Sequence, residues 1–179
     1  MYLFEKNTIN LIKIKIDLLL ILFFLFFFNN AYAEEKFIGF IDTLDGNAAI
    51  TKGEDSIKLN EFDQIFTNDK IIIDEGTSII ISFIDNSLLT IKDESEFFVK
   101  EFDNDSSKPS FILSITKGKF SFESGSIAKN KNGMMKIKLS GMDVKLNGTL
   151  VVGQNTGGNK AVTLVEDSTG NLGTLEVGI

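Results

Sequence analysis

The 179-residue chain contains no histidine, cysteine, tryptophan or arginine, so all 18 of its basic residues are lysines. Without histidine it lacks the commonest general base and the commonest metal ligand. Without cysteine it lacks a thiol nucleophile, a disulfide, a zinc–thiolate site and a lipid-anchor cysteine. Without arginine it has no bidentate donor for phosphate or guanine. We therefore expect a protein that is not an enzyme, and we assign no catalytic, metal-binding or cofactor-binding residues. The sequence leaves open an active site made only of carboxylates or of Ser and Lys, such as a glycosidase-type carboxylate pair, and a metal or ligand bound through carboxylates.

The chain is acidic, with 25 aspartate and glutamate residues and a net charge of −7, which opposes binding to a phosphate backbone. Six lysines within 22 residues are the best argument for a nucleic-acid partner: Lys117, Lys119, Lys129, Lys131, Lys136 and Lys138. Their alternation with apolar residues favours instead the solvent-facing side of two strands and the loop between them. We expect no nucleic-acid partner.

The first 33 residues have the three parts of a secretory signal peptide. Three lysines precede an uninterrupted apolar run of 11 residues, 18–28. Ala31 and Ala33 then supply an A-x-A cleavage signal, so the mature chain is predicted to begin at Glu34. The run is shorter than the roughly 20 residues that span a bilayer. An uncleaved membrane anchor remains the alternative, because the segment before the run is longer than usual.

Cleavage would release residues 34–179, which carry 15 lysines and 23 carboxylates and a net charge of −8. We expect this chain to be periplasmic, secreted or held at a bacterial cell surface, with no stable membrane anchor. Its length suits one domain whose core needs no disulfide. The sequence stops at Ile179 inside an apparent strand, which leaves open that the domain is the N-terminal part of a longer protein.

The mature chain alternates apolar and polar residues with the period of two that is typical of β-strands. The central prediction is a hairpin in which 79–84 turns at Asp85-Asn86 and returns as 87–91. Two further strand pairs are predicted, 111–116 with 119–123 about a turn at Lys117-Gly118, and 135–139 with 142–146 about a turn at Ser140-Gly141.

Shorter strands separated by Gly, Asn and Asp turns complete an all-β pattern. The acidic pairs Asp74-Glu75 and Asp93-Glu94 are expected to flank strands and protect edges. The shorter candidates are 37–44, 48–51, 56–59, 70–73, 97–102, 149–152, 161–165 and 172–177. The predicted core is Ile79, Ile81, Phe83, Phe111, Leu113, Ile115, Phe120, Phe122, Ile137, Leu139 and Val144.

Two segments, 148–153 and 173–178, match at five of six positions. Repeated strand-and-turn units of this kind stack as rungs in solenoid proteins. Chance similarity between two strands explains two copies equally well, so the sequence leaves both readings open.

Three short motifs resemble functional sites without their context. Ser114 and Lys117 are spaced as in the S-x-x-K motif of acyl-enzymes, but residues three apart on a strand point to opposite faces. The segment 103–107 begins like a calcium loop yet lacks the required glycine and closing glutamate. The segment 153–158 is glycine-rich but has no G-K-[ST] of a phosphate loop. A solvated loop and a flexible turn are expected at the last two.

Five groups of segments occur in a fixed order across about 110 residues: 39–41 with 44–48, 65–71, 76–79 with 82–89, 117–122, and 135–137 with 146–149. In this order they resemble the FecR-like domain family, the ferric-citrate-regulator type of periplasmic domain. Asn86 stands where that family usually has glycine, Asn147 where arginine is common, and Ser140-Gly141 where Thr-Pro is usual.

The resemblance implies an all-β domain of stacked, twisted, β-helix-like rungs. In regulators of iron uptake, such a domain relays the state of an outer-membrane transporter through a membrane helix to a cytoplasmic part that acts on a sigma factor; we expect this chain to have neither part. We expect a non-enzymatic, exported module that binds an envelope or surface protein by strand addition. The alternative is a structural segment of a larger surface or adhesive protein. The sequence does not predict the oligomeric state.

Overall fold

The computed structural model describes residues 35–166, 170 and 172–178, which belong to one compact unit, Glu35–Ile179. The predicted signal peptide, with Ala31 and Ala33, lies outside the described residues. Those residues are all-β, as predicted, with 13 strands. They contain no helix that is long and apolar enough to cross a bilayer.

Most strands lie where the period-two pattern predicts them, although strand β4 and the short helix α2 (Ser126–Lys129) were not expected. The strands are β1 (Phe37–Asp45), β2 (Ala48–Lys52), β3 (Asp55–Lys58), β4 (Gln64–Phe66), β5 (Lys70–Ile73), β6 (Ser78–Phe83), β7 (Leu88–Asp103), β8 (Ser110–Glu123), β9 (Met134–Leu139), β10 (Met142–Asn147), β11 (Leu150–Thr156), β12 (Asn159–Val165) and β13 (Thr174–Gly178).

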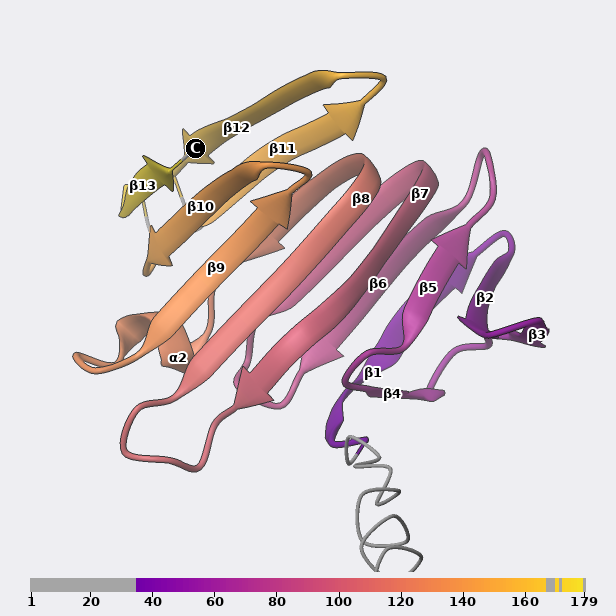
Figure 1. Ribbon diagram of the computed structural model, residues 1–179, viewed down its shortest axis with the longest axis horizontal. Helices are drawn as coiled ribbons and strands as arrows, with labels where there is room; N and C mark the ends of the chain where they lie inside the picture. The colour runs from indigo at the N-terminus through magenta and orange to yellow at the C-terminus, as the bar shows by residue number, and fades with distance from the viewer. Residues whose placement is uncertain (1–34, 167–169, 171, 179) are drawn as a thin grey trace, which may run out of the picture. The chain divides into compact units, whose positions relative to one another are not determined.

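The strands form two layers that share the long strands β7 and β8 (Figure 1). The front layer has the order β3-β2-β5-β7-β8-β9-β10-β13. The back layer has the order β4-β1-β6-β7-β8-β11-β12. The first half of β7 pairs with β6 and its second half with β5, while β8 pairs first with β9 and then with β11. Each long strand therefore bends over from one layer into the other.

The chain crosses between the layers at a row of neighbouring bends, which we call the seam: 45–47, 74–77, 93–95 and 116–118. The bends nest closely. A Cβ atom on Gly46 would overlap Thr77, and one on Gly118 would overlap Ser95. The backbone N–H of Asp93 donates to the carbonyl of Thr77 at 2.7 Å. Backbone bonds and small side chains thus hold successive crossings together.

Two predictions about the residues at the seam are wrong. Lys117-Gly118 does not reverse the chain: Gly118, with φ 123°, bends a strand that continues to Glu123. The segment 97–102 is not a separate strand but the second half of β7, and Asp93-Glu94 lies within that strand instead of flanking it. A glycine or positive-φ residue marks both a bend and a reversal, so the local pattern does not distinguish them.

The strand pairings differ from the β-helix-like rungs that the resemblance implies. Successive coils of a parallel β-helix run in the same direction, whereas every described pairing except that of β8 with β9 is antiparallel. The matching segments 148–153 and 173–178 lead into β11 of the back layer and β13 of the front layer. They are not successive rungs of one stack.

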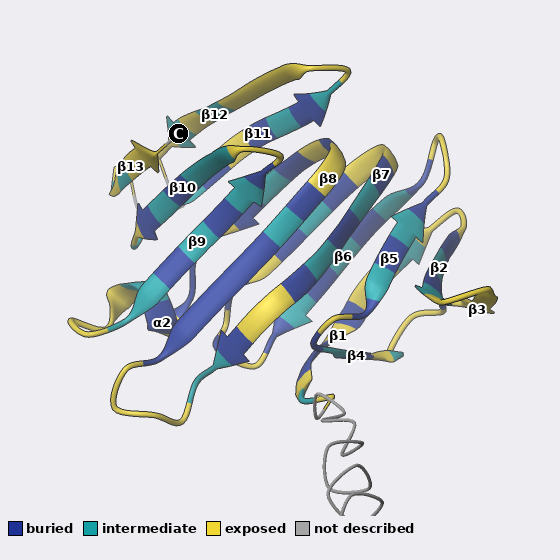
Figure 2. Ribbon diagram, viewed as in Figure 1, coloured by how far each residue is buried: buried dark blue, intermediate teal, exposed yellow. Residues whose placement is uncertain are grey.

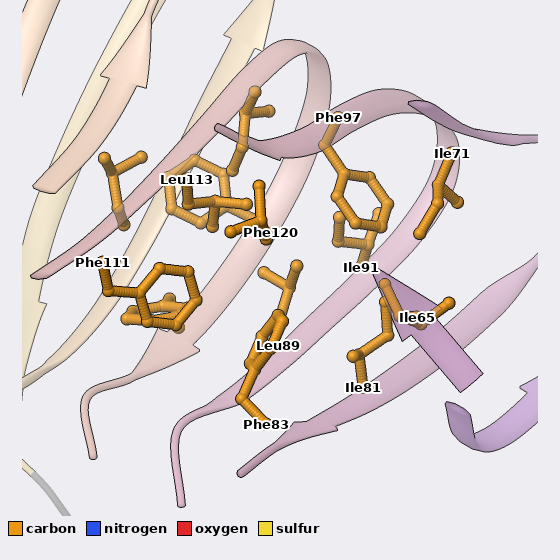
Figure 3. Packing of buried hydrophobic residues seen from close by; sticks show 14 of the residues in the cluster. Ile65, Ile71, Ile81, Phe83, Leu89, Ile91, Phe97, Phe111, Leu113 and Phe120 are labelled. Carbon is orange, nitrogen blue, oxygen red and sulfur yellow. The ribbon is translucent and has the colours of Figure 1, made fainter. Parts of the chain in front are cut away.

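The core lies between the two layers, where alternate residues of most strands are buried, whereas the edge strands β3, β12 and β13 have no fully buried residue (Figure 2). All eleven residues of the predicted core are buried, which confirms the predicted core. Aromatic rings join the layers: Phe111 packs edge-to-face on Phe83 at 4.9 Å and on Phe122 at 5.5 Å between ring centroids. Figure 3 shows Phe83, Phe111 and other apolar side chains of the core meeting between the strands.

A buried polar network closes the β6–β7 turn at the opposite end of the strands from the seam. Asn86 has φ 64°, as the turn requires. The Asp85 carboxylate accepts hydrogen bonds from the Ser87 N–H at 3.0 Å and the Ser87 hydroxyl at 2.9 Å. The Ser87 hydroxyl oxygen accepts the N–H of Gly125 at 2.8 Å. The network ties the turn to the chain between β8 and α2.

Candidate functional site: the free edge of the back layer

The predicted S-x-x-K spacing does not bring its two side chains together. Ser114 lies opposite Phe98 on β7 and Lys138 on β9. The Lys117 ammonium lies at the seam, 2.6 Å from the Glu94 carboxylate. The amine that would serve as base is therefore held in a surface ion pair, away from the Ser114 hydroxyl.

The aspartate loop between β7 and β8 is organised by its own hydrogen bonds. Asp103 Oδ1 accepts the N–H groups of Asp105 at 3.1 Å and Ser106 at 3.2 Å. The pKa of Asp103 is lowered, first by a hydrogen bond from the Ser106 hydroxyl and then by the backbone hydrogen bonds from Asp105 and Ser106. Within the described ranges no three histidine, cysteine, aspartate or glutamate side chains are grouped to hold a metal ion.

The lysine cluster of the sequence is divided between separate elements. Lys136 and Lys138 lie on β9 and both donate to the Asp143 carboxylate of β10, at 3.1 and 2.9 Å. Lys119 lies in the half of β8 that belongs to the back layer. Lys129 ends the helix α2. The lysines therefore form no continuous stripe along one strand pair.

Each layer ends in two edge strands, and they differ in how they are protected. In the front layer the edge strand β3 has four residues and carries Asp55 and Lys58 at its ends, and the other edge strand, β13, has five residues and carries Glu176. The edge strand β4 of the back layer has only three residues. Short, charged edge strands resist pairing with another chain. The seven-residue β12 ends instead in Ala161-Val162-Thr163-Leu164-Val165, without charge or proline.

The backbone of β12 can be oriented from its hairpin with β11. Thr156 pairs with Asn159 around a two-residue turn, Gly157-Gly158, in which both residues have positive φ. In such a turn the flanking residues are hydrogen-bonded to each other, and the pairs then alternate along the ladder. Ala161, Thr163 and Val165 therefore face β11, and Lys160, Val162 and Leu164 direct their N–H and C=O groups outward.

The side chains of β12 keep this edge in place while leaving its backbone accessible. Val162 and Leu164 are half-buried and pack against the core. The Lys160 ammonium donates to the carbonyl of Ser140 at the β9–β10 turn. An anchored apolar strand with outward-facing N–H and C=O groups is the geometry that accepts an added strand.

The sequence predicts a strand at 161–165 but does not reveal that it is an edge. Edge position depends on which strands lie on either side, and β12 pairs only with β11 among the described strands. The absence of charge between Lys160 and Glu166 is the one local signal that was available.

A family model described as "FecR protein" matches residues 69–169, which is more than half of the chain. The match begins after β4 and covers β5 to β12, including most of the seam and the free edge. It agrees with the family suggested by the sequence motifs. Comparisons with curated proteins and with solved structures each give no match. The chain belongs to the FecR protein family.

Proposed function

We propose that this chain is an exported, non-enzymatic module of the bacterial cell envelope that binds another envelope or surface protein. Membership of the FecR family supports both an envelope location and a role related to signal relay. The observation that favours binding by strand addition is the free edge of β12, whose five uncharged residues contrast with the short or charged β3 and β4.

The partner would bind through main-chain hydrogen bonds. A partner strand laid beside β12 would satisfy the outward N–H and C=O groups of Lys160, Val162 and Leu164. Its affinity would come from ladder hydrogen bonds, and its specificity from side chains next to Ala161 and Thr163.

A single backbone N–H tests this proposal. Val162→Pro removes an outward donor, and proline is tolerated at an edge where no ladder bond is lost. Val162→Ala, the matched control, shortens the same side chain but keeps the N–H. In a pull-down from envelope extract, the Pro variant should lose the partner that the wild type and the Ala variant retain. Retention of that partner by a folded Pro variant would refute strand addition at β12.

Export is tested separately. N-terminal sequencing of the exported protein should begin at Glu34, after cleavage between Ala33 and Glu34. Recovery of membrane-bound protein that still begins at Met1 would show an uncleaved anchor instead.

A further inference from the structure

The outward side of the back layer is a sheet face whose middle is uncharged, with Asp45, Lys92 and Lys119 toward one end of the strands and Glu123 toward the other. Residues that alternate with the buried core positions on β1, β6, β7, β8, β11 and β12 point to this side. The strand registers align them in three rows across the strands. The rows are Asp45-Ser78-Lys92-Lys119-Gln154-Ala161, then Thr43-Ile80-Thr90-Ser121-Val152-Thr163, then Phe40-Ser82-Leu88-Glu123-Leu150-Val165.

The middle row has no charged residue, and large apolar side chains are exposed in it and beside it. Val152, in the row, is 46 % exposed, and Phe40 and Leu88, beside it, are each 39 % exposed. Exposed large apolar side chains on an uncharged strip of Thr and Ser are a surface that another protein can cover.

The charges of β8 are arranged symmetrically about the middle row. Lys119 lies two residues before Ser121, and Glu123 lies two residues after it, all on the same face. Both charged side chains are exposed. In the described part of the chain no ion pair within 4.0 Å includes either of them. A positive and a negative group thus stand at about equal distances, roughly 7 Å, from Ser121.

We propose that a second copy of this chain covers the face, with a twofold axis that passes near Ser121 and runs across the strands. This rotation exchanges the outer rows, so Lys119 of each copy faces Glu123 of the other. The uncharged middle rows then pack on each other. The Lys119–Glu123 pair has the self-complementarity that a twofold interface requires, and face-to-face sheets pack about 10 Å apart, within reach of lysine and glutamate side chains. The same rotation sets Lys92 opposite Leu88 and Asp45 opposite Phe40, so the charge argument rests on Lys119 and Glu123 alone.

The size of the face sets the strength of this dimer. Six strands spaced by about 4.8 Å, over about five residues, give roughly 500 Å² per copy. The total of about 1,000 Å² is at the lower limit for a specific interface. The dimer should therefore be weak and reversible, with a Kd on the order of micromolar.

Sedimentation equilibrium of charge variants tests the axis as well as the dimer. Lys119→Glu or Glu123→Lys alone should weaken self-association about tenfold, because each places like charges opposite each other. A mixture of the two single variants should dimerise again, since every facing pair is then opposite in charge. The double variant on one chain should also recover. Lys100→Glu, an exposed position on the front-layer half of β7, makes the same charge change and should have no effect.

A crosslinking experiment gives an independent readout, because the chain has no cysteine of its own. Ser121→Cys should crosslink between copies with a short bis-maleimide, and Ser114→Cys, in the front-layer half of β8, should not. A wild-type chain that stays monomeric to about a hundred times the expected Kd would overturn the proposal, as would single charge variants that dimerise normally.

The dimer and the binding edge are distinguishable. Val162→Pro should leave self-association unchanged, whereas Lys119→Glu should leave capture of the envelope partner unchanged. Loss of the dimer in Val162→Pro would show that the copies pair through β12 and would refute the face-to-face arrangement.

Discussion

Gly118 of β8 lies against Ser95 of β7, so closely that a Cβ atom on Gly118 would overlap the Ser95 hydroxyl oxygen and Cβ. The two residues are the points at which the long strands bend from one layer to the other. Gly118 has φ 123°, a conformation that residues with a side chain rarely adopt. Backbone conformation and close approach therefore both require glycine here.

Gly118→Ala should lower the free energy of unfolding by roughly 2–4 kcal/mol, through backbone strain together with overpacking. Urea denaturation measures this. Gly76→Ala is the matched control, because Gly76 has φ 75° but open space around it; it should cost only about 1–2 kcal/mol. Equal losses at the two sites would show that contact with Ser95 is unimportant. Adding Ser95→Gly should recover part of the loss in Gly118→Ala.

Phe120→Ala should cost roughly 3–5 kcal/mol, the usual range for truncating a buried phenylalanine. Phe120 is buried, and its ring lies so near Gly153 that a Cβ atom there would overlap it. Ile57→Ala on the exposed strand β3 should change stability by about 0.5 kcal/mol or less. A loss below about 1 kcal/mol for Phe120→Ala would contradict its position in the core.

Ser87→Ala should cost about 1–3 kcal/mol, because the Gly125 N–H and the Asp85 carboxylate lose a partner in a buried setting. Ser82→Ala, in a half-exposed position on β6, should be close to neutral. Thermal unfolding of the two variants beside the wild type measures the difference. If Ser87→Ala melts with the wild type, the network contributes nothing to stability.

The ion pairs of Asp143 should make its contribution to stability depend on pH. The hydrogen bond from Lys138, then that from Lys136, lowers the pKa of Asp143 below its usual value. The stabilising effect is therefore fully present above the unfolded pKa of about 3.9 and is lost as the pH falls through the lower, folded pKa. Asp143→Asn should destabilise the protein slightly at about pH 7, and this difference should vanish by about pH 2.

Salt provides the control for that titration. The Asp143 pairs are partly exposed, so the effect of Asp143→Asn at neutral pH should shrink at about 1 M salt. A variant that loses as much stability at about pH 2 as at neutral pH would show that the amide disturbs packing instead of removing a charge.

Local chemistry accounts for what could be predicted from the sequence. Residues such as Ile79 and Phe122 are buried because successive side chains on a strand point to opposite faces, a property of each strand alone. The hairpin at Asn86 was predictable for a similar reason, since asparagine tolerates the positive φ that the turn needs. The absence of histidine, cysteine and arginine likewise excludes imidazole bases and ligands, thiol nucleophiles and bidentate phosphate donors, and this follows from composition without any knowledge of the fold.

Only the tertiary structure decided which glycine reverses the chain and which bends it. Gly141 and Gly118 both have positive φ. The strands on either side of Gly141, β9 and β10, pair with each other, whereas the two halves of β8 on either side of Gly118 pair with β9 in one layer and β11 in the other. The same non-local pairing makes β12 an edge and turns Lys119 and Glu123 to the outward face of the back layer. Strand partners lie tens of residues apart, so the free energy that selects them comes from long-range contacts that a local sequence pattern does not contain.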